Sequence, residues 1–376
     1  MLTLGRKLFG RRTPRSREYK FSRPLVVIQS DDWGRVGVCD REGFEQLRQA
    51  GIQLGERSYD FYSLETAEDC DALRTALSRH RDSVGRAPSV VMNFMTANLD
   101  CAATLANHEI VLKPLAQGLP GSWQRLGLFE AYQRGIADGV FWPALHGRTH
   151  FCPAAVVEFM NVAGERSELL QSLWQAGTPY IHWRMPWVGY EYWHPERKPS
   201  ERFLSSEQQG AAIRQAASEF EQLFGCAPLS ACAPGYRANA DTYQAWSACG
   251  VRVAQNGPGI AQGPSLDGRE MLSLFRNIEF EPATSPCDVA ACIQQAEACF
   301  ARGIPAIVSM HSINLHSTLR DFRTTTLRML DEFFSVLESR HADLLYVHDH
   351  DLFQIVQSGQ YEAASGTVRV AAREVK

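Results

Sequence analysis

Residues 26–34 (VVIQSDDWG) combine a short apolar run with two adjacent carboxylates and a glycine. The pattern predicts a buried β-strand that carries Asp31 and Asp32 at its C-terminal end, after which the chain turns at Gly34. Two carboxylates this close repel each other unless a cation lies beside them. We therefore expect a cation site in which one carboxylate binds the ion while its neighbour stays free to act as a base.

The composition is typical of a folded globular protein. It has 376 residues, of which 45% are hydrophobic, and a formal net charge of -4, which is enough for one large domain or two ordinary ones. The near-neutral charge argues against a nucleic-acid-binding protein, and no apolar run has the length of a membrane span. The 10 cysteines are scattered without a C-x-x-C pair. We expect free thiols in a reducing cytoplasm.

Basic side chains crowd into residues 1–23, where Glu18 is the single acid. The segment lacks the apolar stretch of a secretory signal, so we do not interpret it as one. We expect a soluble N-terminal tail. A weak contact between its arginines and lysines and an anionic membrane surface is the alternative.

Apolar runs alternate with amphipathic stretches from residue 24 onward, which predicts βαβ units and a parallel sheet. The candidate strands are 25–29, 89–94, 140–145, 229–233, 251–254, 306–310 and 344–347. The candidate helices are 40–49, 65–79, 129–137, 153–162, 207–224, 240–248, 288–301 and 320–338. Such a series favours one α/β barrel over residues 24–358, with its active site at the C-terminal ends of the strands. Residues 180–205, rich in Trp, Tyr and Pro, are expected to form a long loop over the barrel mouth, and residues 359–376 a C-terminal tail.

Further ionisable side chains follow other candidate strands. His146 and His150 come directly after the strand at 140–145, and His311 ends the strand at 306–310. Two imidazoles and one carboxylate suit zinc or a similar transition ion and leave positions open for water and substrate. At the end of the strand at 229–233, Pro234 and Gly235 predict a sharp turn that exposes backbone N–H groups, which can stabilise an oxyanion.

The ordered set of Asp31-Asp32, His146-x-x-x-His150, Pro234-Gly235 and the strand ending in His311 resembles the polysaccharide deacetylase superfamily, the NodB-homology carbohydrate esterases. The resemblance covers about residues 24–355. It implies a distorted (β/α)7 barrel and the metal-dependent removal of N- or O-linked acyl groups from sugars, and the ligand types favour Zn²⁺ as the metal. It also implies residue roles: Asp31 as general base, His311 as general acid, and Asp32, His146 and His150 as metal ligands. Gly235 or Tyr236 would supply an N–H to the oxyanion.

Two departures from the family pattern concern residues around Asp31. Trp33 stands between the Asp-Asp pair and Gly34, and we expect it to form a wall of the site, with stacking on a sugar ring as the second option. The arginine that orients the base in the family is absent from its usual place, where this chain has Ala231-Cys232-Ala233. The candidates to replace it are Arg237, Arg184 and Arg148. The acid expected to orient His311 is also not evident, and Asp241 and Glu279 are the candidates for that role.

Three functional hypotheses follow from these residues. The first is a cytoplasmic deacetylase acting on a sugar or glycan precursor, in surface-polysaccharide or O-antigen synthesis. The second keeps the metal and changes the substrate to a non-sugar amide or another acyl group. The third is an inactive barrel that binds glycan, for which the altered third motif is the main support. The aromatic segment, with His182, Trp183 and Arg184, and Arg237 beyond the third motif are expected to line the substrate site.

Overall fold

A curled, mostly parallel sheet forms the centre of the computed structural model, which describes residues 17–121, 123–179, 187–192, 197–198, 201–258 and 262–375. Its inner strands run parallel in the order β13 (Ile278–Glu279), β14 (Ala306–His311), β2 (Leu25–Trp33), β3 (Val90–Met95), β6 (Phe141–Gly147), β9 (Ser230–Cys232), β10 (Val253–Asn256) and β12 (Leu272–Phe275). The short strand β15 (Leu345–Tyr346) pairs with the start of β2. All the strands expected from the sequence are present.

The segment from β12 to β13 closes the curled sheet into a barrel. β12 pairs with β10, whereas β13 pairs with β14 at the opposite edge of the sheet, and only residues 276 and 277 separate them. The Arg276 N–H donates to the Asn256 carbonyl on one side, and the Asn277 N–H donates to the Ile307 carbonyl on the other. One broken strand therefore fills the last of seven positions, and the predicted distorted α/β barrel is confirmed.

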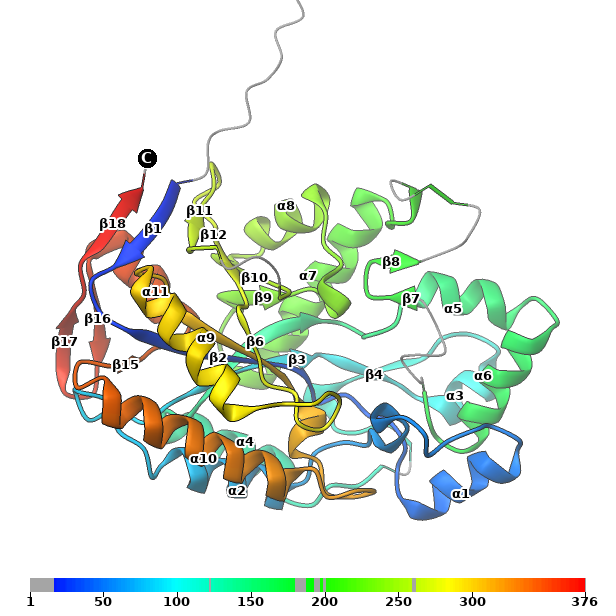
Figure 1. Cartoon of the computed structure of the whole chain (residues 1–376). Coiled ribbons are helices and arrows are strands. Elements are labelled where there is room, and N and C mark those ends of the chain that lie inside the picture. Colours follow the sequence, from blue (N-terminus) through cyan, green and yellow to red (C-terminus); the bar gives the residue numbers. More distant parts are fainter. Residues whose placement is uncertain are drawn as a thin grey trace, which may run out of the picture.

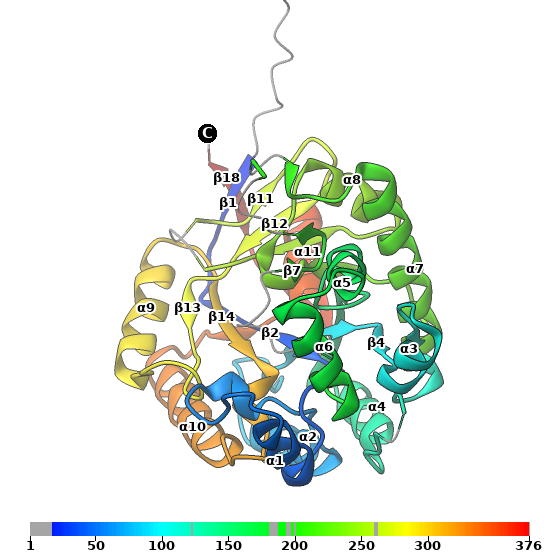
Figure 2. The ribbon, with the colours of Figure 1, turned by 90° about the vertical axis from the view of Figure 1, so that its right-hand side faces the viewer.

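Helices form a ring around the strands, as Figures 1 and 2 show. They are α1 (Arg41–Gln49), α2 (Ala67–Leu77), α3 (Cys101–Asn107), α4 (Leu128–Ala137), α5 (Pro153–Met160), α6 (Glu165–Gln175), α7 (Ser206–Phe224), α8 (Ala240–Ala248), α9 (Val289–Ala301), α10 (Arg323–Arg340) and α11 (Asp349–Ser358). Short 3-10 turns lie at Ser58–Phe61, Leu115–Gln117, Pro234–Tyr236 and Ser312–Leu315. Within the described part of the chain, none of the helices combines the length and the apolar character that crossing a bilayer would require.

The alternation of side chains along β2 explains why Asp31 points into the barrel. All nine residues of β2 are buried. Val26 and Ile28 pack in the cluster formed with the outer helices, whereas Val27 packs with Val91 and Ile307 in a separate cluster that joins the strands to α11. Since successive side chains of a strand point to opposite faces, Gln29 and Asp31 follow Val27 into the interior.

The end of β2 is irregular where the two carboxylates stand. Its register against β3 shifts between Ser30 and Trp33, and Asp32 has a φ of 73° in the left-handed region. That conformation costs about 1–2 kcal/mol in a residue with a Cβ atom. A regular strand would point Asp32 to the face opposite Asp31. The bulge and the left-handed conformation of Asp32 change the direction of the strand end, so that both carboxylates can face the same end of the barrel.

The two ends of the chain differ from the expected tails. β1 (Arg17–Phe21) pairs with β18 (Ala372–Val375) and with β11 (Ser265–Leu266), and Figure 1 shows β1 and β18 side by side. β16 (Gln360–Ala363) and β17 (Gly366–Arg369) form a hairpin. The C-terminal segment is therefore part of the fold, because Tyr361, Val368 and Val370 bury apolar surface in the core. Residues 1–16, with most of the basic side chains, lie outside the described residues.

Further strands lie away from the main sheet. β4 (Ala97–Leu99) pairs with β5 (Leu112–Pro114). β7 (Trp187–Val188) and β8 (Glu191–Tyr192) form a second small pair within the aromatic segment. The rest of that segment falls partly on residues 180–186, 193–196 and 199–200, outside the described residues, so the expected loop over the barrel mouth stays a prediction.

Candidate metal and active site

The ends of β2 and β6 bring three potential metal ligands together. One ligand atom from each of Asp32, His146 and His150 lies within 4.8 Å of the others, and all three side chains are buried. The Nε2 atoms of His146 and His150 lie 3.5 and 3.3 Å from Asp32 Oδ1. The strand ends thus assemble the set that the sequence predicted as metal ligands.

The donor set fits a divalent cation. Asp32 Oδ1 is buried and has no hydrogen-bond partner among the described residues, which is costly for a carboxylate oxygen unless a cation or water satisfies it. His146 Nδ1 lies 2.9 Å from the Cys232 carbonyl oxygen. Because that oxygen can only accept, Nδ1 carries the hydrogen and Nε2 is directed at the site, as in proteins that bind zinc through histidine. Two imidazoles and one carboxylate are ligands that zinc accepts.

The other oxygen of Asp32 is bound by an arginine. Arg35 Nη1 donates to Asp32 Oδ2 at 2.9 Å, and the guanidinium lies over the Tyr62 ring. Burial acts to raise the pKa of Asp32, but Arg35 and the nearby imidazoles hold it well below its usual range. Asp32 is therefore ionised at neutral pH, as a metal ligand must be.

Asp31 is held by Arg276 in a two-point ion pair. Arg276 Nη1 donates to Asp31 Oδ2 at 2.8 Å and Nη2 donates to Oδ1 at 2.6 Å, while Asn93 Nδ2 donates to Oδ1 at 2.8 Å. Arg276 is completely buried. Burial acts to raise the pKa of Asp31, but the charges of Arg276, His146 and His311 overcome it and lower the pKa to about 2. The carboxylate is thus fixed in direction and fully ionised.

Asp31 is held by neither Arg237 nor Arg148, the two expected arginines that the structure describes. Arg237 pairs with Glu191 at 3.2 Å, and Arg148 pairs with Glu219 at 3.0 Å, whereas Arg184 lies outside the described residues. Arg276 was missed because it interrupts a strand whose two halves are short. The sequence feature that could have identified it is the run Leu272–Phe275, in which buried and half-buried residues alternate as in a strand. Arg276 directly follows this strand.

Glu281 orients His311, and it too was missed. Its Oε1 lies 2.6 Å from His311 Nδ1, while Asn314 Nδ2 donates to Oε2 at 2.6 Å. Burial acts to lower the pKa of His311, but Glu281 and, more weakly, Asp31 and Asp32 raise it to about 9. The expected candidates lie elsewhere: Glu279 is exposed, and Asp241 is in the first turn of α8.

The Nε2 atom of His311 faces Asp31 across the site. It lies 3.9 Å from Asp31 Oδ2, and its side chain is 25% exposed, whereas that of Asp31 is 2% exposed. The imidazole is therefore the more accessible of the two groups. Asp31 and His311 are oppositely charged at neutral pH, so a group that can accept a proton and a group that can donate one lie close together.

The remaining expected site residues divide into three groups. Trp33 is 1% exposed and its Nε1 donates to Ser30 Oγ at 2.9 Å, so it forms a wall inside the core, and the option of stacking on a sugar is wrong. The N–H of Tyr236 donates to the Ala233 carbonyl at 2.8 Å, so it is not free to bind an oxyanion, because the 3-10 turn uses it. Gly235 lies in the same turn with a φ of 58°. His182 and Trp183 lie outside the described residues.

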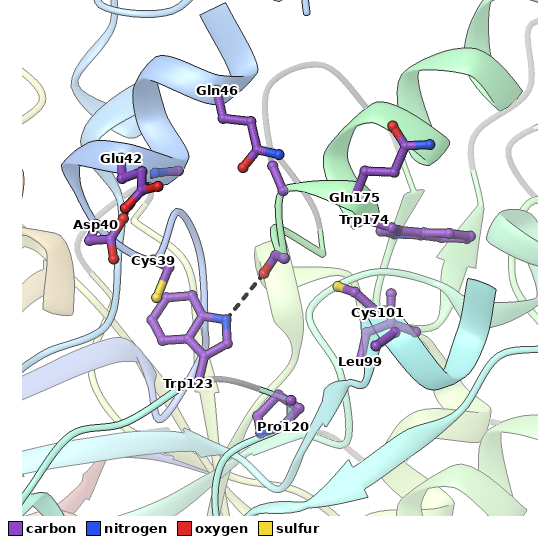
Figure 3. Close-up of a pocket in the computed structure, with 15 residues that line it drawn as sticks. Cys39, Asp40, Glu42, Gln46, Leu99, Cys101, Pro120, Trp123, Trp174 and Gln175 are labelled. Carbon is purple, nitrogen blue, oxygen red and sulfur yellow. Dashed lines mark hydrogen bonds between the residues drawn. The ribbon is translucent and has the colours of Figure 1, made fainter. Parts of the chain in front are cut away.

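A separate cavity of about 310 Å³ lies beside α1 and α6 (Figure 3). Trp123 and Trp174 stand on its walls, and Trp123 Nε1 donates to the Gly177 carbonyl at 3.1 Å. Its lining contains neither of the site carboxylates and none of the site imidazoles. The cavity is therefore not the place where the candidate metal ligands meet.

Of the three comparisons with known proteins, the one with solved structures finds matches. No protein-family model matches the chain, and no curated protein matches it. Solved structures do match. The chain is similar in fold to polysaccharide deacetylases.

Three of the matching solved structures have sequence identities of 9% to 11% and TM-scores of 0.33 to 0.47. A Mycobacterium smegmatis protein provisionally named a polysaccharide deacetylase is 11% identical, with 89% of this chain and 90% of that chain covered and a TM-score of 0.47. A family 4 carbohydrate esterase from Streptomyces lividans, solved with acetate, is 10% identical, with 85% and 90% covered and a TM-score of 0.33. A CE4 family pseudoenzyme from Bacillus anthracis is 9% identical, with 88% and 66% covered and a TM-score of 0.36. At such identities the likeness concerns the fold, and function has to be argued from this chain's own residues.

Proposed function

We propose that the chain is a metal-dependent hydrolase that removes an acyl group, an acetyl group in the simplest case, from the nitrogen or oxygen of a sugar or glycan precursor. The observation that carries the proposal is the cluster of Asp32, His146 and His150, whose ligand atoms lie within 4.8 Å of one another. A base and an acid stand beside it, with His311 Nε2 and Asp31 Oδ2 separated by 3.9 Å. A binding module has no need of this combination.

Asp32, His146 and His150 would hold the cation. A divalent cation there, Zn²⁺ by the character of its ligands, polarises an acyl carbonyl and makes water more acidic. This contribution matters because Asp31, with a pKa of about 2, is a weak base toward ordinary water. Asp31 would accept the proton of the attacking water on Oδ2, the oxygen that faces His311.

His311 would donate a proton to the departing nitrogen or oxygen. Its pKa of about 9 keeps it protonated at neutral pH, and Glu281 fixes the ring so that Nε2 faces the site. A carboxylic acid could not hold a proton under the same conditions, whereas an imidazolium can. The two groups are therefore in the protonation states that acyl-group hydrolysis requires before substrate arrives.

Arg276 weakens the case for an inactive barrel. That hypothesis depended on the absence of an arginine from the third motif, and the ion pair between Arg276 and Asp31 supplies one from another strand. We infer that the substrate is a sugar or glycan precursor, because the residues of the site resemble those of carbohydrate esterases. The substrate class is the part of the proposal that needs direct measurement.

The test is the release of acetate by purified protein loaded with Zn²⁺. The substrates are N-acetylated and O-acetylated sugars in nucleotide-linked, lipid-linked and free oligosaccharide form. Activity that Asp31→Asn abolishes while the bound metal is retained supports the proposal. The proposal fails if metal-loaded protein releases no acyl group from any sugar, and release from simple non-sugar amides alone would move the function to the second hypothesis.

A further inference from the structure

A layer of buried polar side chains lies inside the barrel beneath Asp31, and the proposed chemistry does not use it directly. Its members come from five different elements, and each is at most 2% exposed: Gln29, Asn93, Ser230, Gln255 and Asp349. Buried polar groups are costly unless they are paired, so a layer of this size has to be almost fully hydrogen-bonded. The hydrogen bonds run from Arg276 to Asp349.

Two carboxamides connect Arg276 to Asp349, and both point the same way. Gln29 accepts from Arg276 Nε at 3.1 Å through Oε1 and donates to Asp349 Oδ1 at 2.8 Å through Nε2. Gln255 accepts from Arg276 Nη2 at 3.0 Å through Oε1 and donates to Asp349 Oδ2 at 2.8 Å through Nε2. Each amide thus presents oxygen to the guanidinium and nitrogen to the carboxylate.

The carboxylate of Asp349 requires this direction of both amides. Gln255 is held in the same direction by Asn93 as well, whose Nδ2 donates to Gln255 Oε1 at 2.7 Å and whose Oδ1 accepts from Gln255 Nε2 at 2.9 Å. Asp349 accepts from Gln29, Gln255 and the Ser230 hydroxyl, on both of its oxygens. Burial raises the pKa of Asp349, while the hydrogen bonds from Ser230, Gln29 and Gln255 and the charge of Arg276 act in the opposite direction and favour the carboxylate. A carboxylate accepts on both oxygens and donates on neither, whereas an amide of the same shape must donate on one side. Asp349 is also the first residue of α11, where the helix dipole favours a negative charge.

We propose that Asp349 is a positioning residue of the active site, which fixes the direction of the Gln29 carboxamide, and of Gln255 together with Asn93, and through them holds the Arg276 guanidinium against Asp31. The proposal concerns a role in the reaction and so rests on the proposed function. Without an acceptor at both Asp349 oxygens, one of the two glutamines has to turn over. It then presents N–H groups to the N–H groups of Arg276, and the guanidinium shifts away from its position against Asp31.

A charge-exchange cycle tests this role. Asp349→Asn keeps the shape and removes one accepting oxygen, so we expect kcat to fall about 10- to 100-fold, as a misplacement of about 1 Å can cause, with KM nearly unchanged. Gln29→Glu alone places a second carboxylate against Asp349 and is also expected to lose activity. In Gln29→Glu/Asp349→Asn the introduced carboxylate accepts from Arg276 and from the new amide, with the total charge restored. We expect this double variant to recover kcat to within about threefold of the wild type, since coupled residues deviate this strongly from additivity.

The new amide in Asp349→Asn could instead face Gln255, so Gln255→Glu/Asp349→Asn is measured in parallel. Asp351→Asn is the control. Asp351 is 2% exposed and lies on the same helix, but its carboxylate pairs with Arg86 at 2.5 Å and contacts neither glutamine. It reports general damage to this end of α11 and is expected to leave kcat unchanged.

A second readout does not depend on activity. The Nε–H of Arg276, buried against Gln29, should give a slowly exchanging NMR signal, assigned by its loss in Arg276→Lys. Asp349→Asn is expected to shift this signal, and one of the two double variants to restore it. If the wild type hydrolyses no substrate, the proposed function fails while this signal still reports the geometry.

Three outcomes would overturn the positioning role. The first is an unchanged kcat in Asp349→Asn, and the second is an unmoved Arg276 signal in that variant. The third is a pair of double variants that are both as impaired as the single ones. If Asp349→Asn does not fold, the comparison of Gln29→Glu with the double variant decides, because recovery in the double variant occurs only if the two positions are paired.

Discussion

Glu281 Oε1 and His311 Nδ1 lie 2.6 Å apart, in a contact that joins residues from two neighbouring strand ends. The other oxygen of Glu281 is held by Asn314, so the carboxylate cannot turn away from the ring. The contact fixes both the direction of the imidazole and its charge. Those are the two properties that a general acid needs, and each can be measured.

Glu281→Gln should move the alkaline limb of kcat/KM to lower pH. The His311 pKa is raised to about 9, above its unfolded value, and removing the Glu281 charge lowers it, because burial is then opposed only by the weaker effects of Asp31 and Asp32. The protonated acid would then be lost at a lower pH, and kcat at neutral pH should fall about 10-fold or more, since general acids contribute about 100- to 10,000-fold in all. A cation bound beside Asp32 would repel the imidazolium and shift the alkaline limb to lower pH in the wild type and in Glu281→Gln alike. The prediction is therefore that the limb of the variant lies at lower pH than that of the wild type.

Glu279→Gln is the matched control for this measurement. Glu279 is exposed and two residues away, and no contact joins its side chain to His311 in the described structure. Its profile should coincide with that of the wild type. An alkaline limb that stays in place in Glu281→Gln would show that another group sets it.

Arg276→Leu alone should destabilise the fold more than the double variant Asp31→Asn/Arg276→Leu, which removes both members of the ion pair. Removing one partner leaves Asp31 buried and uncompensated, which typically costs about 3–5 kcal/mol. In Asp31→Asn/Arg276→Leu neither position of the pair carries a charge, so the free energy of unfolding should recover part of that loss. Chemical denaturation of the two single variants and the double variant measures the coupling.

The same pair predicts a dependence of stability on pH. The folded pKa of Asp31 is about 2, below the unfolded value of 3.8, so its stabilisation is present above about pH 4 and is lost as the pH falls toward 2. Denaturation of the wild type over this window should therefore show a fall in stability that Asp31→Asn lacks. Equal slopes in the two proteins would contradict the lowered pKa.

The strand ends that carry Asp31, His146 and His311 could be predicted from the sequence, because each follows an apolar run long enough to identify a buried strand. Arg276 and Glu281 could not, because they stand at and beyond a strand divided into Leu272–Phe275 and Ile278–Glu279. Each half is too short to show the alternation of apolar and polar residues that identifies a strand in a sequence. Their partners also lie 245 and 30 residues away along the chain, and only the closure of the barrel brings them together.

Trp33→Phe should lower stability and leave KM unchanged. Trp33 is buried against Phe94, and its indole N–H donates to Ser30 Oγ. The smaller ring loses that hydrogen bond and leaves a space, which together cost about 1–3 kcal/mol. Denaturation and steady-state kinetics measured on the same preparation separate the two effects. A marked rise in KM with stability intact would return Trp33 to the substrate site.

His150→Ala and His146→Ala should each abolish tight zinc binding, whereas Asp31→Asn should retain it. The reason lies in the geometry: both imidazoles approach Asp32 Oδ1, but Asp31 is occupied by Arg276 and Asn93. A cation that binds the folded state at 1,000 times its Kd stabilises it by about 4 kcal/mol, so the wild type and Asp31→Asn should gain stability with zinc and the histidine variants should not. His350→Ala changes a half-buried imidazole that is stacked with His348, tilted against Trp142 and outside the ligand cluster, and it should behave like the wild type. Zinc content and thermal unfolding with and without a chelator measure both properties, and a histidine variant that keeps stoichiometric zinc would place the metal elsewhere.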